Sequence, residues 1–251
     1  MRFMPKEVLM SSNKYSVLIY STLFFGLGSL IIFTWFLFIG SFTIFDLGLH
    51  TAQSLLLDAG LSLLFFLQHS IMVRQPVRKR LSRIIPDTFY NAFYACTSGM
   101  ALLVVMLFWQ KTPAPLFTAE GASYWLLRML FFLCMAGFSW GTRSLGSFDP
   151  LGVKAIRRHM SEKVSAQMPL KVQGAYQYVR HPLYFFSLIM LWSCPVLTPD
   201  RLLFNLMWTI WIIAGTVLEE RDLVSEFGAQ YQEYQKKVPM LIPYKLPGKA
   251  P

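Results

Sequence analysis

Long apolar runs alternate with short polar segments along the whole chain, and this alternation predicts membrane-spanning helices. The runs fall at residues 15–39, 53–73, 89–109, 124–145, 183–197 and 202–219. An apolar helix needs about 20 residues to cross the hydrocarbon core of a bilayer. Every run except the fifth approaches that length. We therefore expect five long spans and one short one.

The short fifth run ends in a segment that is typical of a turn. Pro195, Thr198 and Pro199 follow it, and Arg201 stands where the sixth run begins. Proline and polar residues in such clusters separate helices. We expect the fifth and sixth runs to form a tight helical hairpin. The start of the fifth helix and the end of the sixth, both away from the turn, should therefore lie close together.

Basic residues collect on one side of the expected spans. They are concentrated at the N-terminus, in residues 74–83, in residues 143–180 and in the C-terminal tail, whereas residues 40–52 contain none. Lys and Arg accumulate in short cytoplasmic loops. With an even number of crossings, this pattern predicts that both termini are cytoplasmic. The net charge of +10 follows from the asymmetry. It favours contact with anionic lipid headgroups over nucleic acid.

The composition supports the same class of protein. The chain is 55% hydrophobic and only 14% charged, far more apolar than a soluble domain. We expect one all-α, polytopic membrane domain over residues 1–251. Cys96, Cys134 and Cys194 are odd in number and lie inside apolar runs, so we interpret them as packing residues rather than a disulfide or metal framework.

Residues 174–184 read G-A-Y-Q-Y-V-R-H-P-L-Y and place polar groups directly before the fifth run. Pro182 marks a helix start, with His181 at the cap position. The amides at a helix start attract anions, and Arg180 adds a full positive charge. The segment therefore predicts a polar site at a membrane boundary, and its tyrosines are Tyr176, Tyr178 and Tyr184.

Glu219 and Glu220 stand where the sixth run ends. The hairpin should bring these carboxylates close to Arg180 and His181. A structural salt bridge would explain one pair, but not two carboxylates and an imidazole at the same depth. Beyond them, helical spacing predicts an amphipathic helix at the membrane surface through Leu223, Phe227, Tyr231 and Tyr234.

The last part of the second run contains Gln68, His69 and Ser70, polar groups within an apolar helix. Such groups are costly in a membrane and either hydrogen-bond a neighbouring helix or serve a function. Tyr94, on the polar face of the third run, is interpreted as a packing residue. Residues 150–173 are basic with interspersed apolar positions, which predicts an interfacial helix.

The motifs together resemble a known family. R-H-P-L-Y is followed about 35 residues later by E-E-R-D-L, then by F-G-x-x-Y-x-x-Y and V-P-M-L-I-P. This order is similar to the membrane-embedded methyltransferases that include isoprenylcysteine carboxyl methyltransferase and the phospholipid N-methyltransferases. Gln68 to Ser70, Phe148 to Gly152 and Trp192 to Thr198 are most similar to the bacterial methanethiol S-methyltransferase and NnrU-like branch.

The resemblance implies S-adenosylmethionine as methyl donor, with S-adenosylhomocysteine as product. Residues 146–251 would form the catalytic core that binds the cofactor, and residues 1–145 would form the N-terminal helices. The acceptor would be a small or lipophilic thiol such as methanethiol, which would become dimethyl sulfide. The expected catalytic residues are His69 as base, Arg180 and Glu220. The expected cofactor-binding residues are Tyr176, Tyr178, Arg180, His181, Pro182, Tyr184, Glu219, Glu220 and Tyr231. Neither a metal nor an obligate protein partner is expected.

The chemistry of the residues agrees with that cofactor and leaves alternatives open. A cation and helix amides suit its carboxylate, carboxylates suit its amine or ribose, and tyrosine rings suit its sulfonium. Carboxyl or lipid-headgroup methylation is an alternative within the superfamily. A transporter or a heme- or metal-handling protein is an alternative outside it, because His69, His159 and His181 lie near the basic side.

Overall fold

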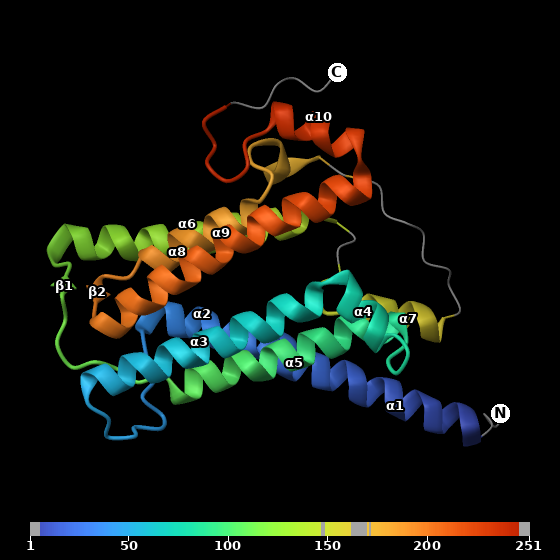
Figure 1. Cartoon of the computed structure of the whole chain (residues 1–251), viewed down its shortest axis with the longest axis horizontal. Coiled ribbons are helices and arrows are strands. Elements are labelled where there is room, and N and C mark those ends of the chain that lie inside the picture. Colours follow the sequence, from blue (N-terminus) through green and yellow to red (C-terminus); the bar gives the residue numbers. More distant parts are fainter. Residues whose placement is uncertain (1–5, 147–148, 162–169, 171, 246–251) are drawn as a thin grey trace.

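The computed structural model describes residues 6–146, 149–161, 170 and 172–245. They form a helical bundle with one two-stranded sheet (Figure 1). The helices are α1 (Lys6–Thr22), α2 (Gly28–Ile39), α3 (Thr51–Val73), α4 (Gln75–Leu81), α5 (Asp87–Phe108), α6 (Gly121–Ser144), α7 (Val153–Met160), α8 (Pro182–Trp192), α9 (Pro199–Phe227) and α10 (Ala229–Lys237). A π-helical turn, η1 (Leu23–Leu27), joins α1 to α2, and a 3-10 turn, η2 (Gly174–Gln177), precedes α8. Strands β1 (Phe117–Thr118) and β2 (Val196–Leu197) pair antiparallel.

The predicted spans are confirmed as helices, and the protein is an integral membrane protein. The described residues contain five helical stretches that are long and apolar enough to cross a bilayer, and α8 is shorter with 11 residues. The long stretches are Lys14–Ile39, Thr51–Val73, Asp87–Phe108, Gly121–Ser144 and Pro199–Phe227. Their outer faces expose large apolar side chains, as expected where lipid is the solvent.

The two ends of the bundle differ in charge. Helices α4, α7 and α10 lie at the same end as the start of α1, and β1 and β2 lie at the other (Figure 1). Each of these three helices has basic side chains in its last turn. We call this the basic end. The charge asymmetry predicted from the sequence is therefore present in the fold.

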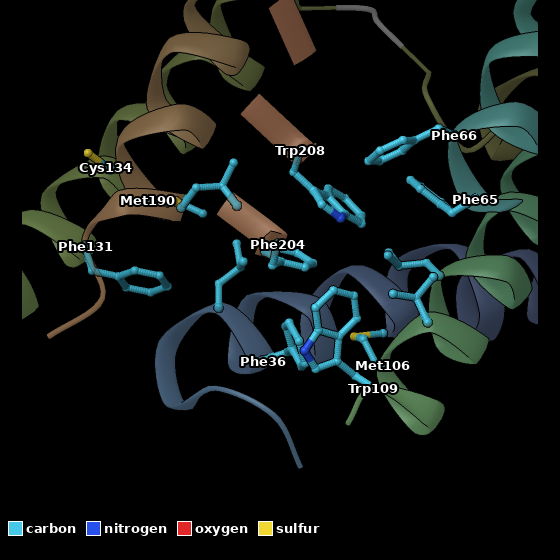
Figure 2. Packing of buried hydrophobic residues seen from close by; sticks show 14 residues of the cluster. Phe36, Phe65, Phe66, Met106, Trp109, Phe131, Cys134, Met190, Phe204 and Trp208 are labelled. Carbon is cyan, nitrogen blue, oxygen red and sulfur yellow. The ribbon is translucent and has the colours of Figure 1, made fainter. Parts of the chain in front are cut away.

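Aromatic side chains fill the middle of the bundle. Phe204 and Trp208 of α9 lie between Phe65 and Phe66 of α3 on one side and Met190 of α8 on the other (Figure 2). Ring stacking adds to the gain from burying these surfaces. The Phe65 and Trp208 rings stack at 5.1 Å between centroids. Helix α9 is thereby fixed against α3, which matters because both contribute to the site.

The predicted hairpin between the fifth and sixth runs is present. Helix α8 ends at Trp192, and α9 begins at Pro199 after a turn that contains β2. Helix α8 also packs closely on α6, because Gly137 has no side chain. A Cβ atom at Gly137 would lie 2.3 Å from the Phe186 ring. The hairpin is thus held against α6 at a fixed depth.

Two arginines hold the C-terminal end of α2. Arg201 of α9 donates to the carbonyl oxygens of Phe36 and Leu37 at 3.3 and 2.9 Å, and Arg128 of α6 donates to that of Phe38. These carbonyls belong to the last turn of α2, a position that favours cations. The Gly40 amide already donates to the Phe36 carbonyl, so the arginines mainly supply donors for the carbonyls of Leu37 and Phe38. Arg201, which is buried, and Arg128, which is half-buried, therefore connect α2, α6 and α9 at the end opposite to the basic end.

Arg201→Leu is expected to destabilise the bundle by roughly 1–3 kcal/mol, because it removes the Arg201 donor from the carbonyls of two buried residues, Leu37 and Leu191. Thermal unfolding in detergent, followed by circular dichroism, measures the effect. Arg221→Leu is the matched control, since Arg221 lies on the same helix but is exposed. Equal midpoints for the two variants would contradict this role of Arg201.

The predicted surface helix has a different start. Helix α9 continues through Leu223 to Phe227 and ends at Gly228, whose φ of 57° is favourable only for glycine, so the separate helix α10 begins at Ala229. The prediction of one helix from Leu223 was therefore wrong. The side chains nevertheless pack together across the bend, because Leu223 and Phe227 pack against the buried cluster that contains Tyr231 and Tyr234.

Within residues 150–173, where the sequence predicts an interfacial helix, the helix itself is confirmed over α7. Its place at the membrane interface stays a prediction. Its residues Arg157, Arg158 and His159 are exposed, and Ile156 is buried. Residues 162–169, residue 171 and Phe148 lie outside the described residues.

Candidate active site

A buried carboxylate at the basic end gathers the segments that the motifs singled out. Glu220, near the end of α9, is 7% exposed. Arg180 donates to both of its oxygens, at 2.9 and 2.7 Å, and His181 Nε2 lies 2.6 Å from Oε1. Tyr231 and Gln235 donate to it at 2.7 and 2.6 Å. We call these five residues the glutamate cluster.

Local structure explains why the cluster forms. Tyr231 and Gln235 are four residues apart on α10 and so share one face of that helix. The bend at Gly228 turns this face toward Glu220. The backbone amides of Arg180 and His181 donate to the carbonyls of Pro239 and Met240, at 2.9 and 3.1 Å. His181 occupies the cap position of α8, but its side chain bonds Glu220 and does not cap the helix.

The charges of the cluster stabilise one another. Burial opposes the charge on Arg180, but the hydrogen bonds and the charge of Glu220 outweigh it and raise the pKa of the guanidinium. Burial, together with hydrogen bonding to Glu220, raises the pKa of Tyr231 far above its ordinary value. Tyr231 therefore stays protonated and donates. Arg180 has further acceptors in the carbonyls of Gln235 and Val238.

Beside the cluster lies a cavity of about 690 Å³ between α3, α5, α8 and α9. Glu219 faces this cavity, and its side chain is 43% exposed. Tyr184 donates to Glu219 at 2.5 Å, and the Tyr184 ring stacks on His181 with 5.5 Å between centroids. The neighbouring glutamates therefore differ: Glu220 points into the cluster and Glu219 toward the cavity.

Aromatic residues form the inner wall of the cavity. His69 lies against the rings of Tyr94 and Trp211. The Tyr94 hydroxyl is 2.7 Å from His69 Nε2. Trp211 stacks on Phe66 at 4.7 Å and donates from Nε1 to the Ser70 hydroxyl at 3.0 Å. The imidazole and the hydroxyls of Tyr94 and Ser70 are thus polar groups on a largely aromatic wall.

Carboxylates dominate the mouth of the cavity. Glu219, Asp222 and Glu226 line it, and Arg74 contributes a positive charge that is paired with Asp222 at 3.0 Å. The cavity therefore favours a positively charged ligand, although the chain as a whole is basic.

The structure places the sequence-predicted residues in four groups. His69, Tyr184 and Glu219 line the cavity, and the cluster contains Arg180, His181, Glu220 and Tyr231. Two others lie close by. Burial, and then the charge of Glu219, raise the pKa of Tyr176. The Tyr176 carbonyl accepts a hydrogen bond from the Tyr234 hydroxyl at 2.6 Å. Pro182 packs beside Gly141. Tyr178 is apart, because its ring lies against Trp140 and is 39% exposed.

Three residues of the site were missed by the sequence reasoning. Gln235 lies one helical turn after Tyr231, a spacing that could have identified it. Trp211 precedes Glu219 by eight residues and so shares a face of α9. Tyr94 was interpreted as a packing residue, and only the contact between α3 and α5 shows that its hydroxyl meets His69.

The fold and the site define a polytopic membrane protein with a polar, aromatic-lined site at one end of its bundle. Relatives identify its family. Methanethiol S-methyltransferases from Crocosphaera subtropica and Pseudomonas sp. are 34% and 36% identical over 200 and 193 residues; each match covers 76% of this chain and 75% or 74% of the relative. Nurim from Rattus norvegicus is 31% identical over 180 residues, 68% of each chain.

The chain belongs to the methanethiol S-methyltransferase family of membrane proteins. It is a methyltransferase, and the resemblance inferred from the motifs is confirmed. No family model and no solved structure matches it.

Proposed function

We propose that the protein transfers a methyl group from S-adenosylmethionine to methanethiol or a similar small thiol. The site would face the cytoplasm of a bacterial cell, with both termini on that side of the inner membrane. The observation that carries the proposal is the acidic, aromatic-lined cavity beside the glutamate cluster. Membership of the family indicates the reaction, and this cavity could hold the methyl donor and the acceptor.

The cavity residues fit the donor. Ligand sites commonly enclose about 300–1,000 Å³, and this cavity has about 690 Å³. Glu219 would bind the donor's amino group, and the rings of Tyr184 and Trp211 would face its positive sulfur. The first amides of α8 suit its carboxylate. When bound, the donor supplies a methyl group on a positively charged sulfur.

Within this proposal Arg180 and Glu220 position the site rather than touch the donor. Both oxygens of Glu220 and the donor groups of Arg180 already have partners within the protein. The pair fixes the segment from Tyr176 to Tyr184 against α9 and α10. Tyr184 and Glu219 are thereby held in place, which matters because methyl transfer is an in-line displacement that depends on alignment.

The aromatic wall favours a small acceptor. Trp211 lines the cavity and stacks on Phe66, and the Phe65 and Trp208 rings contact Trp211 from the bundle core. We infer that these packed rings close the inner end of the cavity to a long chain. A carboxylate acceptor would need a cation to orient it. Of the described residues that line the cavity, Arg74 alone is Lys or Arg, and it is paired with Asp222. Both features favour a thiol over the alternatives of the wider superfamily.

A transfer assay with the purified protein tests the proposal. Tritiated S-adenosylmethionine is supplied with methanethiol, with a prenylated cysteine or with phospholipid, and the label is measured in each product. We expect label in dimethyl sulfide. Label in the prenylcysteine or lipid alone would reject the thiol, and no transfer from this donor to any acceptor would reject the whole proposal.

A further inference from the structure

Tyr94 and His69 form a pair at the inner wall of the cavity. They come from adjacent helices, α5 and α3, and both line the cavity. The Tyr94 hydroxyl lies 2.7 Å from His69 Nε2, within hydrogen-bond distance. The next polar residue, Gln68, has separate partners, because its amide donates to Thr97 and Ser98. The geometry thus couples the phenol to the imidazole.

We propose that Tyr94 is a catalytic residue that takes the proton from the thiol and passes its own proton to His69. This inference rests on the proposed function. A neutral imidazole that carries no proton on Nε2 accepts the Tyr94 hydroxyl there, which leaves the phenol oxygen able to accept from a thiol in the cavity. In this arrangement His69 receives a proton from Tyr94 and does not need to contact the acceptor thiol.

The step balances in atoms and charge. The S–H bond of the thiol breaks as its proton moves to the Tyr94 oxygen, and the former Tyr94 proton moves to His69 Nε2. The thiol sulfur forms a bond to the methyl carbon while the carbon–sulfur bond of the donor breaks, and that electron pair stays on the donor sulfur. The products are a thioether, a demethylated donor without charge on sulfur, and an imidazolium. The imidazolium returns its proton to water.

Other titratable groups around the cavity have other partners or lie at its mouth. Glu219 accepts from Tyr184, and Asp222 is paired with Arg74. The charged or titratable side chains that face the cavity besides the pair are Arg74 at the end of α3, Tyr184 from α8, and Glu219, Asp222 and Glu226 from α9. On α5, Tyr90 is buried and donates to the Met72 carbonyl at 2.6 Å.

Tyr94→Phe tests the relay, because it removes the hydroxyl and keeps the ring. With an alkyl thiol at neutral pH we expect the turnover number to fall about 100-fold or more, the size of a lost general base. With an aromatic thiol that is ionised at neutral pH the fall should be less than about 10-fold, since no proton remains to be moved. The alkyl-thiol rate should recover as the pH rises. S-adenosylhomocysteine affinity, measured by calorimetry, should stay unchanged.

Tyr90→Phe is the matched control, since it removes a buried tyrosine hydroxyl one turn earlier on the same helix. It should not change the ratio of rates for the two thiols. His69→Gln is the second variant and should reproduce the Tyr94→Phe pattern, also if Tyr94→Phe does not fold. Equal losses with ionised and un-ionised thiols would overturn the relay while leaving the proposed function intact. Failure of the unaltered protein to methylate any thiol would reject both.

Discussion

Glu220→Ala is expected to abolish measurable S-adenosylhomocysteine binding and to destabilise the folded protein by about 3–5 kcal/mol. The destabilisation follows because Arg180 would remain buried without its carboxylate, and breaking a buried ion pair carries a cost of that order. The side chains of Arg180 and Glu220 are only 9% and 10% exposed. Calorimetry in detergent measures the binding, and chemical unfolding followed by tryptophan fluorescence measures the stability.

Glu219→Ala is the matched comparison, because it removes the neighbouring carboxylate from the cavity and not from the cluster. We expect it to weaken binding by at least 10-fold with little change in stability, since this side chain is 43% exposed. Unchanged affinity in both variants would reject the placement of the donor in this cavity. Destabilisation by Glu219→Ala as large as that by Glu220→Ala would contradict the division of roles between the two residues.

Much of the fold could be predicted, because the length of an apolar run decides whether a helix spans a membrane. The hairpin was also predictable, because the segment with Pro195 and Pro199 that separates the two apolar runs is only long enough for a short turn. The end of α9 was not, because a helix need not stop where the bilayer does. Residues 218–227 contain neither glycine nor proline, and the helix ends only at Gly228.

The convergence of Arg180 and His181 with Glu220 also followed from the hairpin. The division between Glu219 and Glu220 did not, because adjacent residues on a helix point about 100° apart and their absolute direction depends on packing. Tyr178 illustrates the same limit. It lies two residues from Tyr176, yet its ring is turned toward Trp140, outside the site. Motifs therefore identified the segments, and tertiary packing selected the side chains that face the cavity.

The size of the acceptor should depend on Trp211, and Trp211→Ala is expected to change it. The indole stacks on Phe66 and lines the cavity, so its removal joins the cavity to space near the bundle core. One methylene in an apolar pocket changes discrimination about 10- to 200-fold. We expect the rate ratio of hexanethiol to methanethiol to rise at least 10-fold, as measured by competitive transfer of tritiated methyl.

Trp192→Ala is the control, because Trp192 also donates to a hydroxyl, that of Thr209 at 3.0 Å, but lies 41% exposed at the end of α8 and away from the cavity. It should leave the ratio unchanged. An unchanged ratio in Trp211→Ala, with S-adenosylhomocysteine affinity intact, would show that another surface limits the acceptor. A raised ratio of hexanethiol to methanethiol rates would place the acceptor against α9. The stacked indole of Trp211 would then explain the preference for a small thiol.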